Sequence, residues 1–277
     1  MTDGAPEDIR LGGLVAGDAG LAQDIYLADV LDPIPVEPEL RLQVETAQFD
    51  PGAASAWTHG HGVSLVLVTH GAAYVERRDG DPPVELIQAG SVHVEPQGVP
   101  RRLVNASATR PFGCFRVCMT PTYLEPEVAV EGPVKPRVPP AVDDGDSSSD
   151  PAGDLLIAEA GGPVRRQVHL DRPYPYFPKV PQLQVRVAVG ELAPGGTMPW
   201  HLHNGGGLFL VLRGECVIET RDVDEPEHYR PGDVLFEPIG VVHRGINPSA
   251  TQPYSGIGLK YCHPGLDHDI LESWLAG

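Results

Sequence analysis

The sequence predicts an all-β protein built from two related barrels. Residues 95–111 and 237–253 lie 142 positions apart and share ten of 17 residues, and self-similarity at a fixed period indicates one structural unit that is present twice. The chain of 277 residues contains 32 Gly and 30 Pro, which favours many short strands joined by turns. Its length fits two domains, because a domain usually has roughly 100–200 residues.

Short runs of apolar and β-branched residues, bounded by turn residues, mark the expected strands. They fall at residues 63–76, 84–96, 183–192, 208–220 and 233–238, and such runs indicate an antiparallel sandwich or barrel. The tail differs, because apolar residues recur there at helical spacing and predict one short C-terminal helix. The apolar residues of this expected helix are Leu266, Ile270, Leu271, Trp274 and Leu275.

A Pro-rich and then Asp/Ser-rich stretch separates the two copies of the repeat. It covers residues 131–153, and its composition predicts a flexible linker because it cannot bury a core. We therefore expect an N-terminal barrel at residues 1–130 and a C-terminal barrel at residues 154–277.

Charge and cysteine usage narrow the class of protein. The formal net charge of −18 argues against nucleic acid or an anionic membrane as a partner, since both need a positive surface. The acidic start MTDGAPEDIR and the absence of any run near 18 apolar residues predict neither a signal peptide nor a transmembrane helix. Cys114, Cys118, Cys216 and Cys262 have no zinc or disulfide spacing, which predicts buried free thiols and a cytoplasmic location.

The second copy of the repeat contains a group of histidines with metal-ligand spacing. His201 and His203 are followed by His243 after 40 residues. A His-x-His sequence on a strand places both rings on one face, and neutral imidazole binds Zn, Fe, Cu or Ni. A third histidine from a neighbouring strand can complete the set. The pattern predicts a metal site in the C-terminal barrel.

Glycines and prolines around these histidines resemble the two motifs of the cupin family, G-x5-H-x-H-x3/4-E-x6-G and G-x5-P-x-G-x2-H-x3-N. The second copy matches at Gly195, His201, His203, Gly214, Gly232, Pro238, Gly240, His243 and Asn247. The first copy matches, with Gly52 displaced by one residue, at His59, His61, Gly71, Gly90, Pro96, Gly98 and Asn105. The chain thus resembles a bicupin, which implies two tandem cupin barrels of the jelly-roll, or double-stranded β-helix, type.

The two copies differ at the third histidine, because Arg101 stands where the second copy has His243. An arginine keeps its positive charge and does not coordinate a cation. We therefore expect the N-terminal site, His59, His61 and Arg101, to be degenerate and free of metal. Two alternatives stay open: these three residues bind an anion, or His93 supplies a substitute third ligand.

The glutamate of the first cupin motif is missing in both copies. Gly207 occupies its place in the second copy and Ser64 in the first. We therefore expect three neutral histidines to hold one divalent metal ion per chain, and we expect no role as a base for Glu237, because Glu95 recurs in the degenerate copy. The residues expected around the pocket or behind the ligands are Gly207, Arg213, Lys260, Tyr261 and Cys262.

The resemblance to three-histidine cupins implies a non-haem Fe(II) dioxygenase that acts on a small chelating or anionic organic substrate. Fe(II) is favoured, and Zn, Mn, Ni or Cu remain open. One alternative is a redox-neutral isomerase or lyase, and another is a ligand-binding module without enzymatic activity. The residues assign no catalytic group beyond the metal ligands, and the resemblance is compatible with a homodimer.

Overall fold

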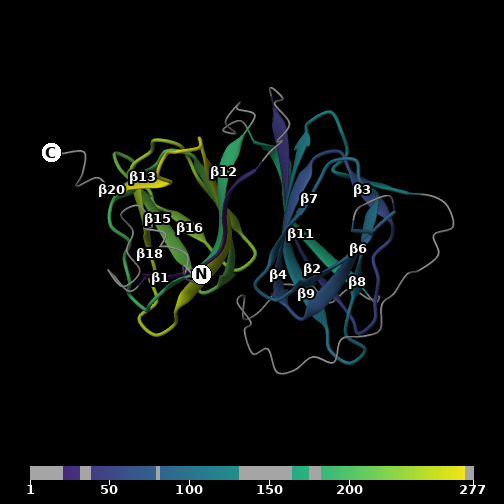
Figure 1. Ribbon diagram of the computed structural model, residues 1–277. Helices are drawn as coiled ribbons and strands as arrows, with labels where there is room; N and C mark the ends of the chain where they lie inside the picture. The colour runs from purple at the N-terminus through teal and green to yellow at the C-terminus, as the bar shows by residue number, and fades with distance from the viewer. Residues whose placement is uncertain (1–20, 32–38, 79–81, 131–163, 175–181, 272–277) are drawn as a thin grey trace, which may run out of the picture.

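The fold is described by a computed structural model that covers residues 21–31, 39–78, 82–130, 164–174 and 182–271. Every regular element in these ranges is a β-strand, and the strands form four five-stranded antiparallel sheets. The predicted all-β fold of two jelly-roll barrels is confirmed (Figure 1). In the part of the chain described here, no helix is long and apolar enough to cross a membrane. The predicted linker at 131–153 lies outside the described residues.

Two sheets form the N-terminal barrel. The first has the order β11 (Val164–Tyr174), β2 (Leu40–Phe49), β9 (Phe112–Pro121), β4 (Val63–His70) and β7 (Val92–Glu95). The second has the order β10 (Glu127–Ala129), β3 (Thr58–Gly60), β8 (Arg101–Asn105), β5 (Ala72–Arg77) and β6 (Val84–Gln88).

Two sheets with the same plan form the C-terminal barrel. The first has the order β1 (Leu21–Leu31), β12 (Leu183–Leu192), β19 (Tyr254–Cys262), β14 (Gly206–Arg213) and β17 (Val234–Glu237). The second has the order β16 (Glu227–Tyr229), β15 (Cys216–Thr220), β18 (His243–Ile246), β13 (His201–His203) and β20 (Asp269–Leu271).

The two barrels exchange their outermost strands. β1 comes before the first barrel in the chain but pairs with β12 of the second barrel, whereas β11 follows the first barrel's strands and pairs back onto β2. Figure 1 shows purple β1 within the green and yellow lobe and β11 within the blue lobe. The expected boundaries, 1–130 and 154–277, assign each of these strands to the opposite barrel, because a contiguous division cannot represent an exchange.

The largest apolar core lies between the barrels rather than inside either one. It joins side chains of β2, β4 and β9 to side chains of β12, β14 and β19, and Leu42, Leu208 and Tyr261 are fully buried in it. A smaller core fills each barrel. Because side chains alternate along a strand, Leu259 and Tyr261 point from β19 into the shared core while Lys260 points into the C-terminal barrel.

The asparagine of the repeat holds a turn in each barrel. The amide of Asn247 donates to the carbonyl oxygens of Leu192, Ala193 and Gln252 at 2.9–3.1 Å. Asn105 donates to three carbonyls at the matching places of the first barrel. These bonds satisfy loop carbonyls that would otherwise be buried without donors, which explains why both copies contain the residue.

The predicted C-terminal helix is wrong where the structure can test it. Asp269–Leu271 form strand β20, which pairs with β13, and Leu266 is 45% exposed in the turn before it. Trp274 and Leu275 lie outside the described residues. Pairing with β13 and the buried side chain of Asp269 overrode the helical spacing of apolar residues. The four cysteines are buried free thiols, as predicted.

Candidate metal centre

Two neighbouring strands bring the three predicted histidines together. His201 and His203 are the two ends of β13 and face the same way, and His201 pairs directly with His243 of β18. All three residues are at most 2% exposed. The Nε2 atoms of His203 and His243 lie 3.2 Å apart. The period of a strand therefore produces the cluster that the sequence pattern predicted.

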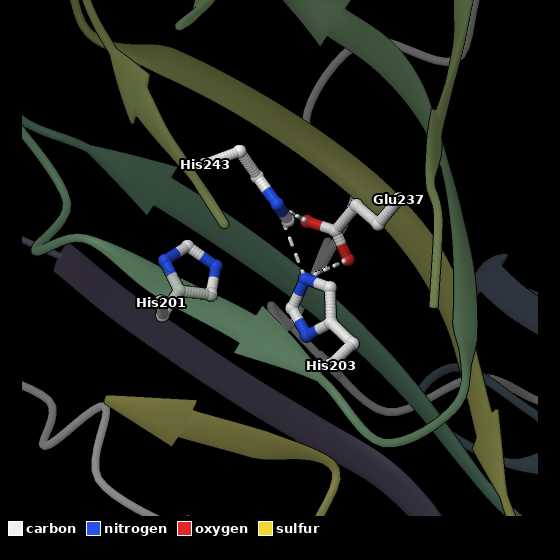
Figure 2. A group of neighbouring side chains, drawn as sticks. All are labelled: His201, His203, Glu237 and His243. Atoms are coloured by element: carbon white, nitrogen blue, oxygen red, sulfur yellow. Dashed lines mark hydrogen bonds and ion pairs between the residues drawn. The ribbon is translucent and has the colours of Figure 1, made fainter. Parts of the chain in front are cut away.

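Glu237 is a fourth member of this cluster. It ends β17, and one ligand atom from each of its members, His201, His203, Glu237 and His243, lies within 4.8 Å of the others (Figure 2). The carboxylate oxygen Oε2 lies 3.2 Å from Nε2 of His203. Oxygen and imidazole nitrogen donors of this kind bind several divalent first-row ions. The candidate ligand set therefore contains three histidines and one carboxylate, whereas three histidines alone were expected.

The carboxylate of the cluster comes from β17, the strand that pairs with β14. Gly207 of β14, which stands at the motif's glutamate position, pairs with Glu237 of β17. A β-carbon on Gly207 would lie 2.6 Å from Oε2 of Glu237, so the glycine makes room for the carboxylate. The missing glutamate was predicted correctly for its motif position, but an acid on the paired strand fills the same space. Glu237 was considered only as a base and not as a ligand, and its repeat partner Glu95 binds Arg101 instead.

Hydrogen bonds orient the imidazole rings. The Nδ1 atoms of His201 and His243 donate to the carbonyl oxygens of Pro199 and Val241 at 2.8 and 2.9 Å. Each ring therefore presents an unprotonated Nε2 to the cluster. Nε2 of His201 is buried and has no hydrogen-bond partner within the described ranges. A buried acceptor without a donor is costly, and a divalent cation at this point would satisfy it.

Charge distributes unevenly over the four ligands. Burial lowers the pKa of His201 to about 3, and it also lowers the pKa of His243. Burial opposes ionisation of Glu237, but nearby His203 and Lys260 hold the pKa of its carboxyl well below the usual value. Burial lowers the pKa of His203, but Glu237 and the bond to Asp269 outweigh it and hold that pKa above the usual value. The cluster thus offers two neutral imidazoles and an ionised carboxylate, and His203 gives up a proton when it binds a metal ion.

Asp269 supports the site from β20. Its Oδ1 lies 2.8 Å from both Nδ1 of His203 and Nζ of Lys260, and its Oδ2 accepts from Arg186 at 2.6 Å. Burial raises the pKa of Asp269, but Lys260, the His203 bond and Arg186 outweigh it and hold that pKa well below the usual value. A carboxylate behind a ligating histidine fixes its ring and raises its basicity. Asp269 was not predicted as a site residue, because the apolar spacing of the tail predicted a helix there.

The other expected pocket residues separate into two groups. Lys260 is 5% exposed, and its Nζ lies 3.3 Å from Oε2 of Glu237, so it belongs to the site as expected. Arg213 pairs with Glu191 at the surface. Tyr261 packs in the core between the barrels, and the thiol of Cys262 donates to the carbonyl of Leu266. These last three residues lie away from the ligands.

The N-terminal barrel differs from the C-terminal barrel at all three histidine positions, and not only at Arg101. Arg101 pairs with Thr58 on β3, as His243 pairs with His201, and the amide of Gly98 donates to Gly60 as that of Gly240 donates to His203. Thr58 and Gly60 therefore occupy the positions of the two ligating histidines. His59 and His61 are one residue out of phase and face away from Arg101, because side chains alternate along a strand.

The position of Gly52, one residue too far from His59 for the cupin motif, indicated this shift in the sequence. Gly52 and Gly195 both have positive φ, 69° in each case, and occupy the same turn. The sixth residue after Gly195 is His201, whereas the sixth residue after Gly52 is Thr58. The expected degenerate site of His59, His61 and Arg101 is therefore corrected to Thr58, Gly60 and Arg101, and an anion site built from the first three residues is excluded by the strand's phase.

An ion-pair network fills the corresponding space in the N-terminal barrel. Arg101 binds Glu95, and Arg116 lies 2.9 Å from Glu95 and 3.2 Å from Glu45. Glu127 accepts from Thr58 at 2.6 Å and from Arg166 at 2.9 Å. His93, the alternative third ligand, instead contacts Glu85 and Arg77. The guanidinium groups of Arg101 and Arg116 thus neutralise Glu95, as a metal cation would.

The C-terminal cluster forms one wall of a small cavity with about 30 Å³ of free volume. His201, His243, Glu237 and Lys260 are among the polar residues that line it. Its apolar lining includes Met198, Phe209, Ile218 and Leu235. Apolar walls around a few convergent polar groups are typical of small-molecule sites.

Comparison with known proteins agrees with this architecture. Residues 188–255 match the cupin domain family. A germin-like protein of Morus alba is 28% identical over 94 residues, which are 32% of this chain and 45% of that protein. Germin-like protein 1 of Brassica napus is 30% identical over 94 residues, with the same shares. The chain thus spans about half the length of the curated relatives it matches.

Solved structures resemble both barrels together. Oxalate decarboxylase of Lactobacillus farciminis matches with a TM-score of 0.54 and 14% identity over 92% of this chain and 89% of that one. The Bacillus subtilis oxalate decarboxylase gives 0.53 and 14% over 95% and 81%, and vicilin from Solanum melongena gives 0.51 and 15% over 83% and 76%. At these identities the likeness shows the fold. Residues 188–255 thus belong to the cupin domain family, and the two barrels together have the fold of a bicupin.

Proposed function

We propose that the C-terminal barrel is the active site of a metal-dependent enzyme that takes a small chelating organic anion. The observation that carries this proposal is the buried cluster of His201, His203, Glu237 and His243, with the partnerless Nε2 of His201 at its edge. When bound there, a divalent ion supplies Lewis acidity and, if it is iron, manganese or copper, one-electron chemistry.

Charge favours an anionic substrate. Three neutral imidazoles and the Glu237 carboxylate leave one positive charge on a divalent ion. Lys260 adds a buried ammonium group, and Asp269 is already balanced by Arg186 at 2.6 Å. A carboxylate entering this cavity meets a net positive field in surroundings of low dielectric constant. The cavity's small volume favours a short organic acid.

Fe(II)-dependent oxygenation is the reaction we put first. Histidine together with carboxylate ligation is typical of non-haem iron oxygenases. The apolar side chains of Met198, Phe209 and Leu235 line the cavity, and exclusion of water protects reactive species from side reactions. His201 and His243 are held by backbone carbonyls, so the ligand frame keeps its geometry when substrate enters.

A redox-neutral lyase or isomerase is the second candidate, and Lys260 is the observation that favours it. Its Nζ is held by Asp269 at 2.8 Å and by Glu237 at 3.3 Å, so the ammonium group is fixed beside the ligands and lines the cavity. A fixed ammonium group can hold a substrate carboxylate or transfer a proton to a developing carbanion.

Metal analysis followed by oxygen uptake tests the proposal. The purified protein should hold one divalent ion per chain. Protein reconstituted with Fe(II) should consume oxygen in the presence of small hydroxy acids, keto acids or dicarboxylates, and the His203→Ala variant should not. Full occupancy by zinc, with substrate turnover but no oxygen uptake, would favour the lyase or isomerase. Absence of metal from both wild type and reconstituted protein would refute an active metal site.

A further inference from the structure

The exchanged strand β1 forms part of the C-terminal cavity. Gln23 pairs with Gly190 of β12, and both residues line the cavity with His201 and Glu237. A β-carbon on Gly190 would lie 3.8 Å from Cγ and 3.9 Å from Nε2 of Gln23. The glutamine side chain therefore lies over the bare glycine, within the wall that faces the ligands. In Figure 2 the purple strand passes directly beside His201.

Outside the candidate metal cluster, Gln23 is a polar residue of this wall that can still form hydrogen bonds. Lys260 is bound to Asp269 and Glu237, and the Cys216 thiol and Tyr254 hydroxyl bond to each other. Among the residues that the structure describes, none forms a hydrogen bond with the amide of Gln23. The side chain is partly accessible, so a ligand in the cavity can reach it.

The N-terminal barrel uses its exchanged strand in the same way. Arg166 of β11 pairs with Ala47 of β2, and the next partners in the two barrels, Cys114 and Gly256, are 142 residues apart, the repeat's own spacing. Arg166 therefore occupies the position of Gln23. It also lines the cavity of its barrel, where it binds Glu127. A polar side chain from the exchanged strand thus enters each barrel, but only the C-terminal one has no partner.

We propose that Gln23 is a specificity-determining residue that bonds to the end of the substrate away from the metal ligands. This inference rests on the proposed function. A neutral amide both donates and accepts a hydrogen bond, so it selects a polar group without requiring charge. The substrate class is therefore a short chelating acid that has a further oxygen function, such as a hydroxyl or carbonyl group, beyond the chelating pair.

Two probes of nearly equal size test this assignment. Lactate and glycerate offer the same hydroxy-carboxylate chelate, and glycerate replaces the methyl group with a hydroxymethyl group. Both are titrated anaerobically into the Fe(II)-loaded protein by calorimetry. Wild type should bind glycerate about 5- to 10-fold more tightly, the effect of one good hydrogen bond. Gln23→Met, which keeps length but removes the amide, should bind both ligands equally and retain its metal.

Further variants make each result decisive. Gln23→Glu keeps the shape of the side chain and should weaken both anions. Arg166→Gln, at the matching position of the other barrel, should keep the wild-type preference. An unchanged preference in Gln23→Met, or no preference in wild type, would overturn the role of Gln23. If binding of both probes is the same in His203→Ala as in wild type, the metal site itself is refuted.

Discussion

His203 and His59 stand in similar His-x-His sequences but face opposite ways. His203 points into the C-terminal cluster and is 2% exposed. The N-terminal positions equivalent to the ligands are Thr58 and Gly60, so His59 points elsewhere. One imidazole therefore belongs to the candidate metal cluster and the other does not, although the two motifs look alike in the sequence.

Substitution of these histidines should give opposite results. His203→Ala should lower the metal content from one ion per chain to near zero, because it removes a candidate ligand that Asp269 holds in place. His59→Ala should retain wild-type metal content. Elemental analysis after dialysis checks both variants. Equal losses in the two would contradict the assignment of a single site.

Gly207 should be as sensitive as a ligand, although it has no side chain. Alanine there would place a β-carbon 2.6 Å from Oε2 of Glu237, so the carboxylate must move out of the cluster. We expect Gly207→Ala to weaken metal binding by about 10- to 100-fold, the range seen when the support of a ligand is disturbed. A competition titration with a chelator measures the change. The matched variant Ser64→Ala should have wild-type affinity, and an equal effect in both would show that the contact does not matter.

The sequence predicted the three histidines at fixed motif positions and missed two acidic residues that occupy no fixed position. His201, His203 and His243 follow from spacing alone. Glu237 and Asp269 do not, because their roles depend on which strands are paired: β17 with β14, and β20 with β13. Cross-strand neighbours are far apart in sequence, so residue spacing contains no signal for them.

At the level of elements, a shift of one position along β3 decides whether histidines face the site. A one-residue slip moves every side chain of a strand to the opposite face. The turn at Gly52 fixes β3 so that Thr58 pairs with Arg101. Arg101 was therefore the visible difference between the copies, but the phase of β3 is the larger one.

Restoring the third histidine alone should fail. Arg101→His leaves Thr58 and Gly60 at the other two ligand positions, so the variant should still bind one metal ion per chain. Glu95 would keep Arg116 at 2.9 Å and stay neutralised. Elemental analysis of Arg101→His in the His203→Ala background gives the clearest reading, since any bound metal must then be in the N-terminal barrel. Stoichiometric metal in that double variant would contradict the phase shift.

The strand exchange could not be predicted from the repeat. β1 and β12 pair over residues 21–31 and 183–192, and a run of apolar residues does not specify its partner. Similarity between the copies fixed their common fold, whereas the partner of the first strand depends on the path of the chain between barrels. The tail helix failed for a related reason, because pairing with β13 overrode local spacing.

At the scale of the whole molecule, the barrels share their largest core and two strands, so they should unfold together. Separation would expose Leu42, Leu208 and Tyr261, which are fully buried in the folded chain. Calorimetry of the metal-free protein should show one transition whose calorimetric and van't Hoff enthalpies agree. Two resolved transitions would mean that each barrel is stable without the other.

Because the barrels are joined in this way, acid should act on the whole molecule through the N-terminal network. Burial opposes ionisation of Glu127, but Arg116 and Arg166 lower its pKa from 4.5 to about 2. A lowered pKa stabilises the fold above the unfolded value, and this contribution is lost as the pH falls from about 4.5 to about 2. For Glu127 it amounts to about 3 kcal/mol at neutral pH.

Glu127→Gln isolates this contribution from other acids. Urea unfolding should show the variant less stable than wild type by up to about 3 kcal/mol at pH 6, and the difference should shrink toward zero as the pH approaches 2. The exposed pair of Glu191 and Arg213 supplies the control, since Glu191→Gln should differ from wild type by less than about 1 kcal/mol at every pH. A Glu127→Gln deficit that stays constant down to pH 2 would show that its charge does not stabilise the fold. Since unfolding is shared, the same variant should also lose bound metal at a lower urea concentration, although Glu127 lies in the other barrel.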